Sequence, residues 1–285
     1  MNQTTIKSDC LINRGVGLHS GKEVPIHFSP AGPDHGIVFH RLDKGIRIPA
    51  IYNFAKPSPL CTTIQKDGTS IATIEHLLSV CNGMGIDNLL VELKGEEIPI
   101  FDGSGYEFYQ QLDQVGIKEL PVAKKAIRII EPISFEKGDI RIIATPAKES
   151  VFTFSIEYEH QQIGAQEVTF VLNTKNYIDQ IVRAKTFCLE EDVQKMKKMG
   201  LIKGGSKKNA IVLNQEGQFD NLNVMTWLNE PNLHKILDQI GDFYLANNLR
   251  ILGNIYSHKS GHAAHSEFLH YMFDECSDSF EIVEI

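Results

Sequence analysis

Histidine and aspartate side chains recur at helical spacing in the segment 233–245. His234, Asp238 and Asp242 lie four residues apart, so on an α-helix they stack along one face. A histidine and an aspartate one turn apart can bind the same divalent cation, because both side chains can reach it. Taken alone, this pattern is more typical of a solvent-exposed helix face, so a metal site requires a further ligand from elsewhere in the chain.

A second segment places Glu75 directly before His76. Consecutive helical residues point about 100° apart, so the imidazole can ligate a cation while the carboxylate stands beside it. A catalytic zinc ion commonly takes three protein ligands and keeps one position open for water. His76, His234 and Asp238 would supply those ligands, and Glu75 would take a proton from the water. In isolation the Glu-His pair is more typical of a surface dipeptide.

A third candidate is His262, which follows a glycine in the segment 259–262. Such a turn can hold the imidazole rigidly while leaving it accessible. If Asp242 faces this ring, its negative charge raises the pKa of the imidazole. A cationic His262 could then stabilise an oxyanion and protonate a leaving nitrogen, whereas a helix cap or a surface histidine is the alternative. We predict that three neighbouring histidines lie at the surface: His258, His265 and His270.

These residues must be positioned by helices and strands. The order of strand-like and helix-like segments predicts an α+β fold in two similar halves, and in each half strands come first and helices pack on them. Hydrophobic periodicity predicts helices over Thr69–Cys81, Tyr106–Val115, Glu190–Met199, Leu233–Leu245 and Ala263–Phe273. Short β-rich segments precede the helices in both halves. A polar stretch around Pro121 separates them. We therefore predict an N-terminal domain over 1–122 and a C-terminal domain over 123–285.

Composition narrows the class of protein. The 285 residues include 28 basic and 36 acidic side chains, for a net charge of −8. This balance argues against nucleic-acid binding, which needs a basic surface. The five cysteines contain no Cys-x-x-Cys pair, which argues against a disulfide framework. No segment has the length and apolarity of a signal peptide or a membrane helix, so we expect a cytoplasmic protein.

Several motifs in a fixed order resemble one family. They are Gly15–Gly21, Cys61–Thr63, Thr73–Leu78, Gly85–Asn88, Glu97–Ser104, Ala184–Phe187, Gly200–Ser206, His234–Asp242 and Ser260–His262. With these motifs the chain resembles the UDP-3-O-acyl-N-acetylglucosamine deacetylases, the zinc enzymes of lipid A synthesis in Gram-negative bacteria. The similarity extends over nearly the whole length.

The resemblance implies a role for each candidate residue. The metal ligands would be His76, His234 and Asp238, and the cation would be Zn²⁺, with Fe²⁺ as the alternative. The catalytic residues would be Glu75 as base, His262 as acid, Asp242 as its partner and Thr186 as a donor to the oxyanion. The substrate-binding residues would include Lys235 and Lys259 near the diphosphate and Phe187 on the nucleotide side.

The resemblance also implies an architecture, in which the helices of two α+β domains are sandwiched between two outer sheets. An insert, spanning about 188–213 here, would form a hydrophobic passage for the acyl chain. The candidate lining is Met196, Met199, Leu201 and Ile202, for which an ordinary core position is the alternative. Several positions depart from the family pattern: Lys185, Lys207, Lys208, the segment Gly105–Glu107, and His265, which stands where asparagine is usual.

The implied reaction is hydrolysis of UDP-3-O-acyl-N-acetylglucosamine to UDP-3-O-acyl-glucosamine and acetate, the committed step of lipid A synthesis. We expect a monomer that binds this substrate and no nucleic acid. Two alternatives remain open. One is a zinc amidohydrolase that acts on another N-acetyl sugar, and the other is a non-catalytic homologue that only binds a nucleotide sugar.

Overall fold

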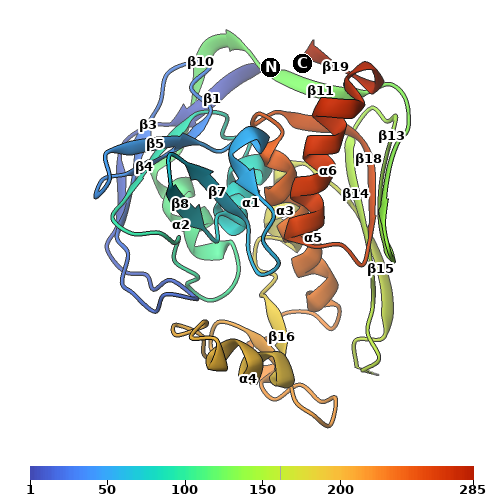
Figure 1. Cartoon of the computed structure of the whole chain (residues 1–285). Coiled ribbons are helices and arrows are strands. Elements are labelled where there is room, and N and C mark those ends of the chain that lie inside the picture. Colours follow the sequence, from blue (N-terminus) through green and yellow to red (C-terminus); the bar gives the residue numbers. More distant parts are fainter. Residues whose placement is uncertain (161) are drawn as a thin grey trace.

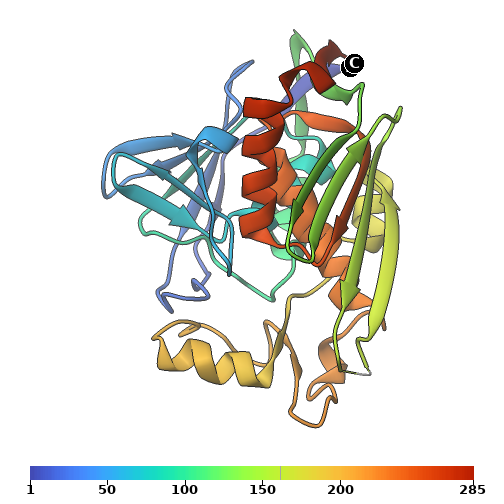
Figure 2. The ribbon, with the colours of Figure 1, turned by 45° about the vertical axis from the view of Figure 1, so that its right-hand side comes forward.

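The long helices lie between two outer β-sheets, as Figure 1 shows. The computed structural model describes residues 1–160 and 162–285. The N-terminal sheet and the C-terminal sheet flank the helices on opposite sides, and the view in Figure 2 shows the same layering. The predicted α+β sandwich is confirmed.

The N-terminal sheet has five strands in the spatial order β2 (Cys10–Ile12), β3 (Ile26–Pro30), β9 (Leu89–Leu93), β4 (Ile37–Arg41) and β5 (Ile46–Pro49). Its central strand, β9, pairs antiparallel with β3 and parallel with β4. Leu89, Val91 and Leu93 alternate with less buried residues, so one face of β9 enters the core. The first domain also contains α1 (Glu75–Met84) and α2 (Tyr106–Val115).

The C-terminal sheet has seven strands. They are β11 (Lys125–Ile129), β12 (Ile133–Lys137), β13 (Ile140–Thr145), β14 (Ser150–Glu157), β15 (Ala165–Val171), β18 (Arg250–His258) and β19 (Phe280–Glu284). Strand β18 pairs with β11, β13 and β14 along its length. The helices of this half are α3 (Thr174–Gln180), α5 (Glu230–Asp242), α6 (His262–Glu275) and the short 3-10 turns Phe243–Leu245 and Ser277–Ser279.

Helices α1 and α5 meet at the centre of the molecule because Gly241 has no side chain. A Cβ atom at Gly241 would lie 2.0 Å from the carbonyl oxygen of Glu75. Asn82 on α1 donates through Nδ2 to the carbonyl oxygen of Ile240 on α5 at 3.1 Å. The two segments that carry the candidate chemistry therefore share one tightly packed helix interface.

The predicted helix over Thr69–Cys81 is wrong at its start. Thr69–Ala72 forms β8, which pairs with β7 (Thr63–Lys66), and β7 pairs in turn with β6 (Ala55–Lys56) after the 3-10 turn Tyr52–Phe54. The β-branched residues of β8 gain a partner strand, and this pairing outweighs the helical spacing. Helix α1 begins only at Glu75 and has no side-chain cap.

The polar stretch around Pro121 belongs to a strand. β10 (Ile117–Ala123) pairs antiparallel with β1 (Asn2–Ile6), with Ala123 opposite Asn2. The proposed division between residues 122 and 123 falls at the end of this strand and stays a prediction.

The segment predicted as an insert forms a small unit that projects from the body of the molecule, at the bottom of Figures 1 and 2. It consists of β16 (Phe187–Leu189), α4 (Glu190–Lys198) and β17 (Ile211–Leu213), with the two strands parallel. A 3-10 turn at Leu222–Val224 follows before α5. Within the described residues, none of the helices combines the length and apolarity needed to cross a membrane.

Candidate metal centre

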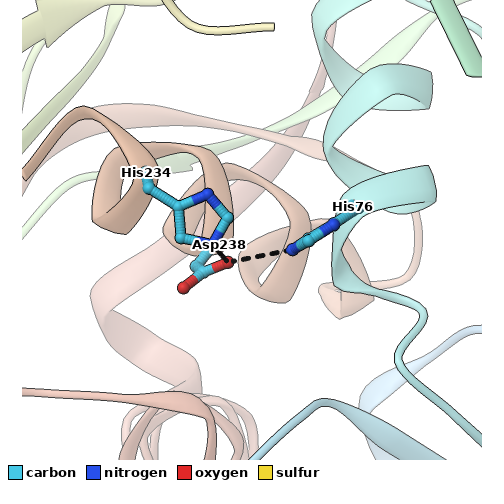
Figure 3. Close-up of side chains that lie close together, drawn as sticks. All are labelled: His76, His234 and Asp238. Carbon is cyan, nitrogen blue, oxygen red and sulfur yellow. Dashed lines mark ion pairs between the residues drawn. The ribbon is translucent and has the colours of Figure 1, made fainter. Parts of the chain in front are cut away.

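Three of the predicted ligands converge from two helices. His76 extends from α1, and His234 and Asp238 extend from successive turns of α5 (Figure 3). Asp238 Oδ1 lies 3.2 Å from His234 Nε2 and 3.7 Å from His76 Nε2. All three side chains are buried, so the polar atoms face one another out of contact with bulk water.

The protonation states of His76, His234 and Asp238 suit the binding of a cation. His234 Nδ1 lies 3.0 Å from the carbonyl oxygen of Ala184; since that oxygen only accepts, Nδ1 carries the hydrogen and a neutral ring keeps its Nε2 lone pair. Burial lowers the pKa of His234, and burial together with the proximity of His234 lowers the pKa of His76 to about 3. Asp238 Oδ1 has no hydrogen-bond donor among the described residues. Two imidazole lone pairs and a carboxylate oxygen thus converge, which is a ligand set that fits Zn²⁺.

The second oxygen of Asp238 is fixed by Lys235, whose Nζ donates to Oδ2 at 3.0 Å. Burial raises the pKa of Asp238, but the electrostatic interactions with His234 and Lys235 outweigh burial and hold it below its usual range. The Lys235 ammonium also lies 5.8 Å from the centre of the Phe187 ring. Lys235 therefore orients the carboxylate so that Oδ1 faces the histidines.

Glu75 lies next to the metal-binding group at the start of α1. Its carboxylate is buried, and Oε2 accepts a hydrogen bond from the backbone N–H of Thr62 at 2.9 Å. Burial raises the pKa of Glu75 well above its ordinary value. Glu75 and the three candidate ligands line the same cavity, which has a volume of about 460 Å³. A raised pKa in such a cavity is typical of a carboxylate that exchanges protons with substrate.

His262 lies at the first position of α6 and pairs with Asp242 on α5. Its Nδ1 donates to Asp242 Oδ2 at 2.8 Å, and its Nε2 lies 3.8 Å from Asp238 Oδ2. Burial lowers the pKa of His262, but the Asp242 and Asp238 carboxylates outweigh burial and raise it to about 10. At neutral pH His262 is therefore an imidazolium whose Nε2–H points toward the metal-binding group.

The predicted surface location of His265 is wrong. Only 1% of the residue is exposed, and its Nδ1 lies 2.6 Å from Asp242 Oδ2. The sequence carries a signal for this burial, because His265, Phe268, Leu269 and Met272 follow helical spacing and all are buried. His258 and His270 are partly exposed, as expected.

The cavity also contains most of the residues predicted to bind substrate. Phe187, Lys235, Met196 and Ile202 line it, and so does Thr186, the predicted donor to the oxyanion. Three other residues predicted to bind substrate do not line this cavity: Met199, Leu201 and Lys259. Met199 is 71% exposed. Lys259 forms an ion pair with Glu157 at 2.5 Å. The cavity thus extends from the metal-binding group to the unit formed by β16, α4 and β17.

Two residues that position the site, Thr62 and Glu230, were not predicted from the sequence. The Thr62 hydroxyl donates to Asp242 Oδ1 while its backbone N–H binds Glu75. Glu230, fully buried in the first turn of α5, accepts from the backbone N–H of Lys185 at 2.9 Å, and so ties the segment next to Thr186 to the ligand-bearing helix. Thr62 lies inside one of the family-like motifs, whereas Glu230 lies before the predicted helix, which the sequence placed at Leu233–Leu245 and which begins at Glu230 in the structure.

Fold and site together define a two-domain α+β protein with a buried group of two imidazoles and a carboxylate that can hold a metal ion in a deep cavity. The family model described as UDP-3-O-acyl N-acetylglycosamine deacetylase matches residues 3–274, and the chain belongs to this family.

Curated relatives agree with the family model along the whole chain. A UDP-3-O-acyl-N-acetylglucosamine deacetylase of Nautilia profundicola is 37% identical over 285 residues, covering 99% of this chain and 95% of the relative. Proteins of the same name from Myxococcus xanthus and Campylobacter hominis are each 37% identical. These two alignments cover 99% and 92% of this chain, and 89% and 88% of the respective relative.

Proposed function

We propose that this protein hydrolyses the acetamide of UDP-3-O-acyl-N-acetylglucosamine, releasing acetate and UDP-3-O-acyl-glucosamine as the committed step of lipid A synthesis in the cytoplasm. The relatives carry the name of this activity. The observation that carries the proposal is that His76, His234 and Asp238 converge in the cavity that also contains Glu75 and His262. A metal-ligand set beside one carboxylate and one imidazolium can supply the base, the acid and the carbonyl polarisation for amide hydrolysis.

Zn²⁺ is the cation that this ligand set suits best, with Fe²⁺ as the alternative. His76, His234 and Asp238 would hold it. When bound, such a cation polarises the acetyl carbonyl and lowers the pKa of water in the site.

Glu75 acts as the general base in this proposal. Its raised pKa, caused first by burial, increases its affinity for the proton of the attacking water. The backbone N–H of Thr62 holds the carboxylate at 2.9 Å, so Glu75 does not need to reorient during the reaction. Proton removal lets the water oxygen attack the acetyl carbon.

His262 and Thr186 stabilise the tetrahedral intermediate that follows the attack. The Nε2–H of the His262 imidazolium and the hydroxyl of Thr186 face the cavity as donors for the oxyanion. When the carbon–nitrogen bond breaks, His262 delivers its Nε2 proton to the amine. Asp242 keeps the ring in the orientation that this transfer needs.

The remaining lining of the cavity suits the two ends of the substrate. Met196, Ile202 and neighbouring apolar residues of the insert 188–213 would contact the acyl chain, Lys235 would lie near the diphosphate, and Phe187 would lie on the nucleotide side. A role for Lys259 near the diphosphate would require it to leave Glu157. All of these groups come from one chain, so we propose that the monomer is active.

The test is acetate release from purified protein and UDP-3-O-acyl-N-acetylglucosamine, measured as isolated, after chelation, and after addition of Zn²⁺ or Fe²⁺. We expect turnover that the chelator abolishes and zinc restores. UDP-N-acetylglucosamine without the acyl chain and a panel of other N-acetyl sugars serve as matched controls. Equal turnover of a control sugar would favour the broader amidohydrolase, and binding without acetate release would favour the non-catalytic homologue.

A further inference from the structure

We propose that His265 is a positioning residue, which acts on catalysis by holding the Asp242 carboxylate that orients His262. The inference rests on the proposed function for its catalytic consequence. The contact itself is a feature of the fold that can be measured without substrate.

The carboxylate of Asp242 is held from three directions. Oδ2 accepts from Nδ1 of His262 at 2.8 Å and from Nδ1 of His265 at 2.6 Å. Oδ1 accepts from the hydroxyl of Thr62. Without His265 the carboxylate keeps one donor on each oxygen, whereas the additional donor on Oδ2 restricts its orientation further.

The donor on His265 is defined by its surroundings. A carboxylate oxygen only accepts, so Nδ1 of His265 carries a hydrogen. On the opposite side of the ring, Ser260 Oγ lies 2.9 Å from Nε2, within hydrogen-bond distance. The ring also packs against Phe243 and Phe154, with centroid distances of 5.1 and 6.2 Å. Ser260 and the two aromatic rings thus fix the orientation in which Nδ1 of His265 faces Asp242.

The Asp242–His265 contact joins α5, which carries two of the metal ligands, to α6, which carries the proposed acid His262. Asp242 lies one turn beyond the ligand Asp238 on α5, while His262 and His265 lie one turn apart at the start of α6. The shared carboxylate therefore sets where α6 begins relative to the metal-binding group. Without His265, we expect the His262 ring to sample orientations in which its Nε2–H misses the leaving nitrogen, and misplacement of this kind lowers kcat more than it weakens substrate binding.

Two amide variants separate the two contacts of His265. In His265→Asn the side-chain amide nitrogen occupies about the place of Nδ1, so it can still donate to Asp242 but loses Ser260. In His265→Gln the amide nitrogen occupies about the place of Nε2, so it keeps Ser260 within reach but loses Asp242. The pair is matched, since both replace a buried ring by a neutral amide.

We expect His265→Asn to keep kcat within roughly threefold of wild type, while His265→Gln lowers kcat by roughly tenfold or more. KM and bound metal stay unchanged in both variants, because His265 itself does not line the cavity and neither of its contacts involves a metal ligand. A kcat loss of equal size in both variants would overturn the proposal, since general loosening of the core would then explain it. Unchanged kcat in a folded His265→Gln would overturn it as well.

Proton NMR of the imidazole N–H groups tests the contact directly. Strong donation to a buried carboxylate moves an N–H resonance far downfield, so wild type should show two such signals and His265→Asn only the one from His262. A single downfield signal in wild type would overturn the proposal. These two spectra are decisive even if His265→Gln fails to fold. Absence of acetate release by wild type would instead count against the proposed function.

Discussion

Substitution of one glycine tests whether the contact between α1 and α5 sets the geometry of the site. Gly241 lies between the two ligand-bearing helices, directly against the first turn of α1 that carries Glu75 and His76. In Gly241→Ala the only new atoms are those of a methyl group at this interface. Any change in catalysis must therefore come from the relative placement of the helices.

The structure gives the size of the displacement. The new Cβ would lie 2.0 Å from the carbonyl oxygen of Glu75, and ordinary contact begins at 3.4 Å, so the helices must separate by the difference, about 1.4 Å, along this line. A misplacement of about 1 Å can cost roughly 10²-fold in rate. Overpacking of this kind costs about 1–3 kcal/mol of stability. We expect both effects, together with weaker metal binding because His76 moves away from the ligands on α5.

The assays are kcat/KM for acetate release, zinc affinity by competition with a chelator, and the free energy of unfolding from denaturant titration. Gly32→Ala is the matched control, since a Cβ there meets nothing within 4 Å. If Gly241→Ala kept wild-type kcat/KM and zinc affinity within about twofold, a range well below the roughly 10²-fold expected, the inference that this helix contact positions the site would be wrong.

Three further substitutions probe single groups. Glu75→Gln should keep its zinc while kcat falls roughly 10²- to 10⁴-fold, and a near-normal kcat would remove Glu75 from the role of base. His234→Ala should lose zinc on gel filtration, because one of three ligands is missing; elemental analysis decides, and full retention of zinc would contradict the ligand assignment. Thr62→Val removes the hydroxyl donor to Asp242 but keeps the backbone N–H on Glu75, so we expect a loss of about 1–3 kcal/mol of stability, and an unfolding curve that matches wild type would show that the Asp242 contact contributes nothing.

The local part of the site could be predicted from sequence because helical geometry is short-range. The spacing of His234 and Asp238 already placed both on one face of α5, and the structure has them there. The approach of His76 depends on how α1 packs on α5, and the spacing of residues carries no information on that packing. Only the order of the family-like motifs connected the two helices.

The two wrong predictions, the helix start at Thr69 and the surface location of His265, also depend on contacts with residues distant in the chain. Thr69–Ala72 has helical spacing with the residues that follow, but its strand partner β7 decides its conformation. His265 was predicted to lie at the surface because polar residues usually do. Its burial follows from the packing of α6 on α5 and from the Asp242 carboxylate, a partner 23 residues away.

X-ray absorption at the zinc edge on zinc-loaded protein tests the central claim, that two imidazoles and one carboxylate bind a single cation. We predict one zinc per chain with two imidazole rings and light oxygen ligands at about 2.0–2.2 Å. A sulfur ligand at about 2.3 Å, or zinc that fails to reach one equivalent at saturation, would contradict the assignment of His76, His234 and Asp238.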